Sequence, residues 1–269
     1  DIDIIGVTTL PGLLGPLLTG LNAAKTLSLL YQKPIIPINH LYAHLEAIHL
    51  TEEVPYPYLG LLISGGHSAF MWVQSATKFT IVGSTIDDAA GEAFDKGGKL
   101  MKLGYPAGRI IDELAKTGDK SSFNFPIGLR SSADARFSFS GLKTSLRVQI
   151  EKNPDLIIDP NPDLCAAYQD AIVRALILKS KYAVKAIKEK FGVSHFPIVL
   201  GGGVACNSAI REEFSKRYPH SHFVAPKYCT DNGAMIANYA LRTQDQKIPH
   251  PLCLELDSRG RFIDKKDYK

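Results

Sequence analysis

Two histidines four residues apart are the first feature with chemical potential. His40 and His44 lie in the sequence HLYAH, within a helix-compatible segment over residues 40–50. Side chains four residues apart lie one helical turn apart on the same face, so both imidazoles can reach one metal ion. Leu41 occupies the position where zinc proteases of the H-E-x-x-H pattern carry their glutamate general base. The pair predicts either a metal site without a built-in water activator or a helix with two ordinary histidines.

A third histidine and a distant aspartate are the next residues to consider. His49 follows His40 by nine positions, a half-turn out of phase in an α-helix, and is expected on the ordinary helix surface outside the site. Asp231, in the segment TDNGAM, has two interpretations. Either Thr230 or Asp231 caps the following helix, or the Asp231 carboxylate is a third metal ligand that leaves coordination positions open for substrate.

Two glycine-rich turns follow apolar strands. In the first, Gly65 and Gly66 stand between two apolar runs and predict a hairpin, and His67 can point into the same space. In the second, residues 201–207 (GGGVACN) join an apolar strand to a helix. Such turns can present backbone N–H groups to an anion, or they can simply allow a tight change of chain direction.

An acidic run precedes and enters a predicted helix over residues 87–103. Asp88, Glu92 and Asp95 are expected on one face of this helix. That face is either solvated or turned toward a cleft, where carboxylates can bind ribose hydroxyls.

The elements that must position these residues alternate between strands and helices, which predicts an α/β fold. The predicted strands cover residues 4–9, 34–39, 58–74 (a hairpin), 196–200 and 222–224. The predicted helices cover a segment ending near residue 31, then residues 40–50, 87–103, 109–116, 142–151 and 165–191, and one helix after each of the last two strands. Residues 257–269 are polar and are expected to form a mobile tail.

Composition sets broad limits on function. The 269 residues are 45% apolar and 22% charged, which is typical of a globular protein, and the net charge of +4 permits a nucleic-acid partner without implying one. The uncharged stretch 4–24 is interrupted by Pro-Gly and Gly-Pro pairs, so a soluble strand–helix unit is favoured over a membrane span. The four cysteines form no C-x-x-C pair, which fits a reducing cytoplasm or, alternatively, an organelle matrix.

Seven motifs in this order resemble one family, the TsaD family of tRNA threonylcarbamoyladenosine transferases, formerly described as O-sialoglycoprotein endopeptidases. The motifs are HLYAH, LLISGGH, STIDDAAGEAFDK, YPAG, FSFSGLKTS, GGGVACNSAIR and TDNGAMIA. The resemblance extends from about residue 1 to about residue 245. The segment DDAAGEAFDK resembles the sequences of the bacterial and organellar branch of the family.

The resemblance implies an actin-like ATPase (ASKHA) fold with two α/β lobes, a site in the cleft between them, and a first lobe that is incomplete at its N-terminus. We expect residues 1–57 to be the remainder of the first lobe, residues 58–229 to form the second lobe, and residues 230–269 to comprise the metal-ligand loop, a returning helix and the tail. The implied reaction moves a threonylcarbamoyl group from threonylcarbamoyl-adenylate to N6 of the adenosine beside the anticodon of tRNAs that read ANN codons, with release of AMP.

The resemblance also implies roles for particular residues and partners. His40, His44 and Asp231 would bind one Fe²⁺ or Zn²⁺ ion per subunit, and His67 is a candidate for positioning or proton transfer. The implied contacts to the adenylate, or to bound ATP or AMP, are Leu62, Ile63, Ser64, Gly65, Gly66, Asp95, Gly108, Asp112 and Asn207. The implied partners are tRNA and proteins of the TsaB and TsaE types, with no membrane.

Two other functions stay open at this stage. A metal-dependent endopeptidase would use the same histidines, but Leu41 in place of a glutamate argues against it. A non-catalytic nucleotide-binding scaffold would keep the fold without the chemistry, and the intact residues His40, His44, Asp231 and Asn207 argue against that.

Overall fold

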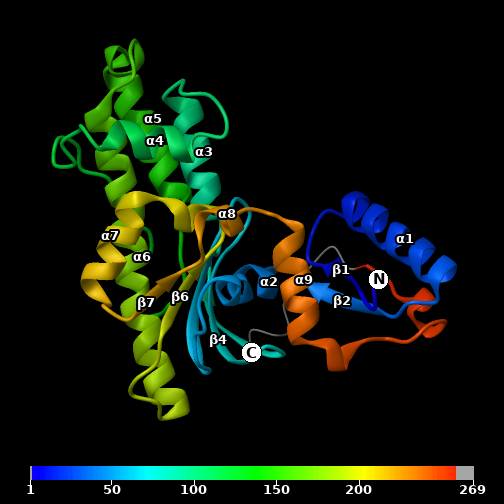
Figure 1. Cartoon of the computed structure of the whole chain (residues 1–269). Coiled ribbons are helices and arrows are strands. Elements are labelled where there is room, and N and C mark those ends of the chain that lie inside the picture. The colour runs from blue at the N-terminus through cyan, green and yellow to red at the C-terminus, as the bar shows by residue number, and fades with distance from the viewer. Residues whose placement is uncertain (1, 259–269) are drawn as a thin grey trace.

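The computed structural model describes residues 2–258, so most of the predicted tail, from residue 259 onward, lies outside the described residues. Figure 1 shows two α/β parts side by side, with helices α2 (His40–Glu46) and α9 (Gly233–Arg242) where they meet. The smaller part combines the start of the chain with its returning C-terminal segment. The division of the chain into lobes at residues 57 and 229 stays a prediction.

The smaller part is built on a parallel two-stranded sheet of β1 (Ile5–Leu10) and β2 (Ile35–Asn39). Helix α1 (Leu14–Tyr31) connects the two strands, and α9 packs against both of them. This confirms the predicted strand–helix–strand unit. Between residues 2 and 258, no helix is long and apolar enough to cross a membrane.

The larger part contains a five-stranded sheet in the order β5-β4-β3-β6-β7. Its strands are β3 (Tyr58–Ile63), β4 (Ser68–Ser75), β5 (Lys78–Ser84), β6 (Ile198–Gly201) and β7 (Ser221–Phe223). Every residue of the central strand β3 is buried, because helices and neighbouring segments cover both faces of the sheet there. The predicted hairpin is confirmed as β3–β4, whereas β5, which pairs with β4, was not predicted.

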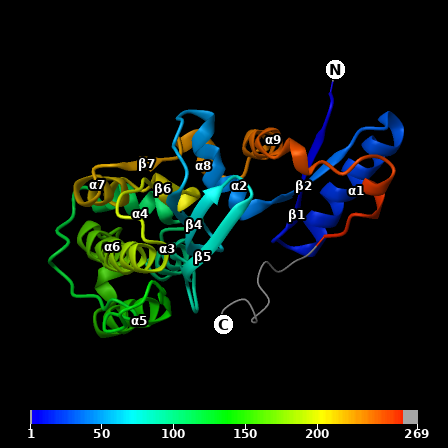
Figure 2. The ribbon, with the colours of Figure 1, turned by 90° about the horizontal axis from the view of Figure 1, so that it is seen from below.

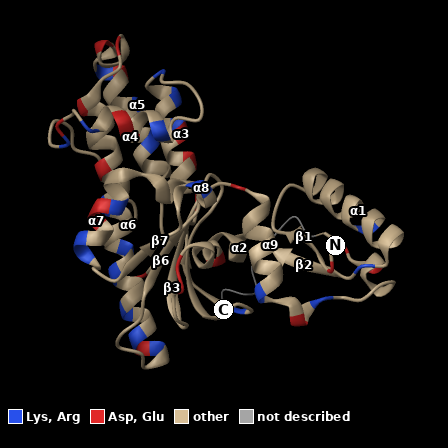
Figure 3. Ribbon diagram, in the orientation of Figure 1, with Lys and Arg blue, Asp and Glu red and all other residues tan. Residues whose placement is uncertain are grey.

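The remaining helices pack around this sheet unevenly: Figure 2 shows α3 to α7 gathered on one side of it, with α2 on the other side. They are α3 (Ala90–Leu100), α4 (Gly108–Ala115), α5 (Ser140–Lys152), α6 (Pro162–Phe191), α7 (Ser208–Arg217) and the short α8 (Pro226–Cys229). Figure 3 shows that Lys and Arg are interspersed with Asp and Glu on these helices, and that α1, β1 and β2 carry few charges.

The prediction of a helix over residues 87–103 was wrong at its start. Helix α3 begins only at Ala90, because the Asp87 carboxylate accepts hydrogen bonds from Phe139 N–H (2.8 Å) and Ser140 Oγ (2.9 Å) beside the start of α5. Asp88 pairs with Lys96 instead of lying on an open acidic face. Two carboxylates of the acidic run therefore stabilise the fold of this part.

The predicted surface position of His49 was also wrong. The α-helix ends at Glu46 and continues as a tighter 3₁₀ turn over Ala47–Leu50. A 3₁₀ turn has about three residues per turn, so the α-helical phase no longer applies at residue 49. The His49 side chain is fully buried, and neither ring nitrogen has a hydrogen-bond partner within residues 2–258.

Buried His49 predicts a loss of stability in acid. Burial is the largest cause that lowers the His49 pKa; Arg242 lowers it further, and Glu46 and Glu53 oppose the shift. Because the pKa is lower in the folded chain, the unfolded chain binds more protons as the pH falls below about 6.5, and folding becomes less favourable. We expect the melting temperature of the His49→Gln variant to fall less between pH 7 and pH 5 than that of the parent. Equal decreases in calorimetric scans would contradict this.

Candidate metal and nucleotide site

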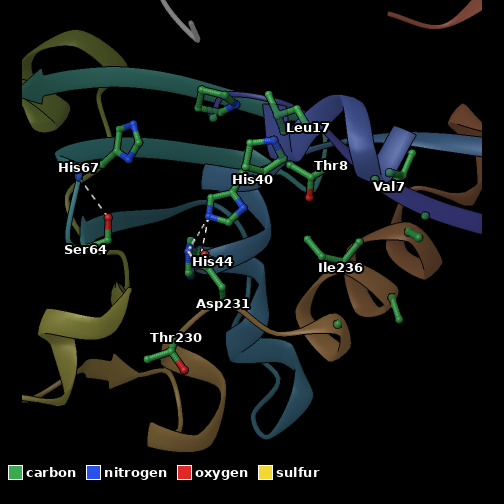
Figure 4. Close-up of a pocket in the computed structure, with 18 of the residues that line it drawn as sticks. Val7, Thr8, Leu17, His40, His44, Ser64, His67, Thr230, Asp231 and Ile236 are labelled. Carbon is green, nitrogen blue, oxygen red and sulfur yellow. Dashed lines mark hydrogen bonds and ion pairs between the residues drawn. The ribbon is translucent and has the colours of Figure 1, made fainter. Parts of the chain in front are cut away.

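Three side chains from two distant segments converge on one point. The Nε2 atoms of His40 and His44 are 3.1 Å apart, and Asp231 Oδ1 lies 3.2 Å from the first and 3.1 Å from the second. The histidines come from α2, and Asp231 comes from the loop before α9 (Figure 4). The sequence predicted both histidines on one face and offered Asp231 as a third ligand, and the structure brings the three side chains together.

The donor set fits a divalent metal ion. Two ligand atoms that are each about 2.1 Å from one ion, at tetrahedral or octahedral angles, lie about 3.0–3.4 Å apart, and the three observed separations fall in this range. Two neutral imidazoles that face each other through their Nε2 atoms can share only one proton, whereas a cation would satisfy both lone pairs. His44 is buried, whereas the Asp231 side chain is 77% exposed, which leaves one side of the triad accessible.

The charge state of Asp231 suits this role. Hydrogen bonds from the His40 and His44 rings hold its pKa far below the usual range for a carboxyl group, although partial burial opposes the shift. The carboxylate therefore stays ionised at neutral pH and is available as a metal ligand.

Two asparagines hold the ligand-bearing segments in place. Asn39 caps α2, with its Oδ1 accepting from Leu41 N–H at 2.9 Å. Asn232 caps α9 by accepting from Met235 N–H at 2.9 Å, so the prediction that Thr230 or Asp231 provides this cap was wrong. Because the following residue caps the helix, the Asp231 side chain is free to join the histidines. Sequence reasoning missed both asparagines, although an asparagine directly before a helix is a recognised capping signal.

The triad opens into a large cleft with a volume of about 1340 Å³. One side is lined by residues 64–67 and by the triad, and the other by β1, the start of α1 and α9. Figure 4 shows Val7, Thr8 and Ile236 on that second side. The cleft therefore runs between the two parts of the molecule, and its size suits a ligand as large as a nucleotide.

The two glycine turns contact each other at the edge of this cleft. A Cβ on Gly202 would lie 2.4 Å from the Ile63 carbonyl oxygen, and one on Gly201 would lie 2.8 Å from the His44 carbonyl oxygen. Glycines at these positions allow the strand ends to approach each other and the metal-ligand helix. By contrast, Gly65 and Gly66 face open space, which leaves room for a ligand.

His67 lies in the same cleft and is half-buried. Its backbone N–H donates to Ser64 Oγ at 3.1 Å, and this bond closes the hairpin turn (Figure 4). Burial, followed by the nearby His40 and His44, lowers the pKa of the His67 ring. A neutral imidazole is therefore favoured here, which is the form that can accept a proton.

The other predicted substrate contacts do not line this cleft. Leu62 and Ile63 are fully buried, so their contact with a ligand stays a prediction. Asp95 Oδ1 accepts from Ala107 N–H at 2.8 Å, directly before Gly108 at the start of α4.

The Asp112 and Asn207 side chains both form hydrogen bonds at the start of α7. Asp112 accepts from both Ser208 N–H (2.9 Å) and Ser208 Oγ (2.8 Å) at the start of α7. Asn207 donates to Gln169 Oε1 at 2.6 Å and caps α7. Both side chains therefore already have protein partners, and their contact with a ligand stays a prediction.

The fold and the site together define a class of protein: a two-part α/β protein with a triad suited to a metal in the cleft between its parts. Residues 1–238 match the TsaD family, described as tRNA N6-adenosine threonylcarbamoyltransferase. The chain belongs to this family.

Relatives and a solved structure agree with this assignment. A tRNA N6-adenosine threonylcarbamoyltransferase from Anaeromyxobacter sp. (strain Fw109-5) is 46% identical over 242 residues, which cover 88% of this chain and 71% of the relative. The protein of the same name from Brachyspira hyodysenteriae is 40% identical over 270 residues, covering 99% and 77%. The crystal structure of full-length HypF has a TM-score of 0.59 at 14% identity, covering 90% of this chain and 47% of HypF. The last comparison concerns the fold alone and confirms the predicted ASKHA type.

Proposed function

We propose that this protein transfers the threonylcarbamoyl group of threonylcarbamoyl-adenylate to N6 of the adenosine beside the anticodon in tRNAs that read ANN codons. The observation that carries the proposal is the convergence of His40, His44 and Asp231 in a nucleotide-sized cleft of a TsaD-family chain. In the reaction, the adenosine N6 forms a bond to the carbamoyl carbon, the bond from that carbon to the phosphate oxygen breaks, and AMP leaves.

Two parts of the site would act directly on the adenylate: the metal-binding triad and the glycine turn at residues 65 and 66. The triad would hold one Fe²⁺ or Zn²⁺ ion, since two imidazoles and a carboxylate suit both. When bound, the ion supplies a Lewis acid that polarises the carbamoyl carbonyl. The turn at Gly65 and Gly66 would receive the AMP phosphate, because both residues line the cleft and a Cβ at either would meet no other atom.

Orientation and proton transfer fall to other residues. Cleft walls from both parts of the molecule would hold the adenylate and exclude water, which places the weakly nucleophilic amine against the carbamoyl carbon. His67 faces the same cleft as a neutral base and would take the proton that N6 loses. Asp95, Gly108 and Asp112, which lie outside the lining of the cleft, would contact the nucleoside part, and Asn207 would help to hold the adenylate.

Partners and location belong to the same proposal. The tRNA substrate follows from the reaction, and proteins of the TsaB and TsaE types would assist as in the bacterial branch of the family. A cytoplasmic location, or alternatively an organelle matrix, fits a tRNA-modifying enzyme.

Reconstitution tests the proposed function. We expect the full-length protein, combined with threonine, bicarbonate, ATP, an adenylate-forming enzyme, the partner proteins and tRNA, to produce threonylcarbamoyladenosine, measured by nucleoside mass spectrometry. Omission of the protein is the control. If the folded, metal-loaded protein forms none of this nucleoside, the proposal is wrong.

A further inference from the structure

A buried carboxylate ends the helix that carries His40 and His44. Glu46 is the last residue of α2, and its side chain has no exposed surface. The Tyr56 hydroxyl donates to one of its oxygens at 2.6 Å, and the Tyr58 hydroxyl donates to the other at 2.7 Å. Burial, followed by the Glu46 charge, raises the pKa of both phenols, so both hydroxyls stay protonated and able to donate.

The same carboxylate is connected to α9. Arg242, in the last turn of α9, donates from Nε to Glu46 Oε2 at 3.0 Å and from a terminal nitrogen to the Tyr56 hydroxyl at 3.1 Å. One turn earlier, Asn238 Nδ2 donates to the Glu46 backbone carbonyl at 2.9 Å. Both the side chain and the backbone of Glu46 therefore bind α9.

This network suits a role in geometry more than in stability. Desolvation of a buried ion pair offsets much of its attraction, so its net contribution to folding is small. A buried network in which every group has a partner instead favours one arrangement of its elements, because any displacement leaves a buried polar group unpaired. Here both carboxylate oxygens have partners, and the elements held together are α2, α9 and β3.

These two helices are the ones that bring the triad together. His44 precedes Glu46 by two residues on α2, and Asp231 precedes Gly233, the first residue of α9, by two. The separations of 3.1–3.2 Å between the carboxylate and the imidazoles therefore depend on how α2 lies against α9.

We infer that Glu46 is a positioning residue for the metal site: through Arg242, Tyr56 and Tyr58 it locks α2 against α9 and so determines the affinity of the triad for its metal. The inference rests on the metal-ligand role that the proposed function gives to His40, His44 and Asp231. Residues that orient metal ligands from outside the coordination shell typically change affinity by 10- to 100-fold when mutated.

The test measures Zn²⁺ affinity by competition with a chromophoric chelator, without reference to catalysis. Glu46→Gln keeps the size of the side chain but leaves Arg242 without its charged partner. We expect the Zn²⁺ dissociation constant to rise about tenfold or more, and the absorption spectrum of the Co²⁺-loaded variant to differ from that of the parent. We expect Arg242→Gln to raise the Zn²⁺ dissociation constant to a similar extent. The double variant should bind Zn²⁺ no more weakly than the weaker-binding of the two single variants, because both substitutions act through one network.

Leu146→Ala is the matched control for lost stability. Leu146 is a fully buried residue of α5, which packs on α3 and α6 in the larger part. We expect this variant to melt at a lower temperature and to keep the parent Zn²⁺ affinity. Tyr58→Phe, which removes one hydrogen bond and keeps the carboxylate, is a milder variant if Glu46→Gln does not fold, and should weaken binding severalfold.

The outcomes separate this inference from the proposed function. If the parent binds Zn²⁺ and folded Glu46→Gln and Tyr58→Phe bind it equally tightly, only the positioning role is overturned. Equal losses of affinity in Leu146→Ala and Glu46→Gln would also overturn it, since general destabilisation would then explain both. If the parent itself binds no Zn²⁺, Co²⁺ or Fe²⁺, the proposed metal site fails and the inference fails with it.

Discussion

Replacement of His44 by alanine is expected to remove the metal from the purified protein and to lower the rate of threonylcarbamoyladenosine formation by about 100-fold or more. The imidazole supplies one of the three ligand atoms that converge among residues 2–258, and it is the buried one. A site reduced to His40 and Asp231 keeps two ligands, too few to hold a catalytic ion with useful affinity. Metal stoichiometry by mass spectrometry and product by nucleoside analysis measure the two effects separately.

A second histidine variant controls for the loss of an imidazole. His222 lies on β7 and pairs with Glu52 at 2.8 Å, outside the cleft. We expect His222→Ala to keep both metal and activity. An unchanged metal content in His44→Ala would show that His44 is not a ligand. Loss of activity with retained metal would point instead to a packing role for this side chain.

The elements of the site could be predicted where local rules decide them. The spacing of four placed His40 and His44 on one face because both lie within a regular α-helix. The apolar runs on either side of Gly65 and Gly66 predicted the β3–β4 hairpin for the same kind of reason.

Local rules failed where the backbone leaves its regular geometry or where tertiary contacts decide the outcome. His49 is buried because α2 tightens into a 3₁₀ turn, which no periodicity argument anticipates. Helix α3 starts later than predicted because the Asp87 carboxylate instead accepts a hydrogen bond from Phe139 N–H, beside the start of α5 and some fifty positions along the chain. Strand β5 lies at the edge of the sheet and has only one buried residue, so its sequence lacks a strong apolar signal.

Pairings between distant segments are the part that sequence periodicity cannot supply. Asp231 was assigned to the two histidines through the family resemblance, because its own surroundings favoured a helix cap over a metal ligand. The Glu46–Arg242 pair had no such support, and a charged residue on a short helix is ordinarily expected at the surface. In the structure, the Glu46 side chain is buried between the segments that carry the triad.

Gly202→Ala should have the largest effect on folding of any single methyl group added near the site. Gly202 has φ 91° and ψ 161°, a region that is essentially restricted to glycine. The added Cβ would also lie 2.4 Å from the Ile63 carbonyl oxygen, which belongs to the buried central strand and cannot move freely. Backbone strain and this overlap together should lower the free energy of unfolding by about 3 kcal/mol or more. Urea denaturation measures this loss, which is a large share of the stability of an ordinary domain.

The neighbouring Gly203 provides a matched control because it has neither the positive φ nor the close contact of Gly202. At Gly203 the nearest atom to an added Cβ is Thr230 Cγ2, at an ordinary contact distance of 3.8 Å, and this residue lines the same cleft. We expect Gly203→Ala to change stability by less than about 0.5 kcal/mol. Similar stabilities for the two variants would mean that the turn relaxes around Gly202. The close approach of the two glycine turns would then be incidental to the site and not a requirement for bringing residues 63–66 up to the metal-ligand helix.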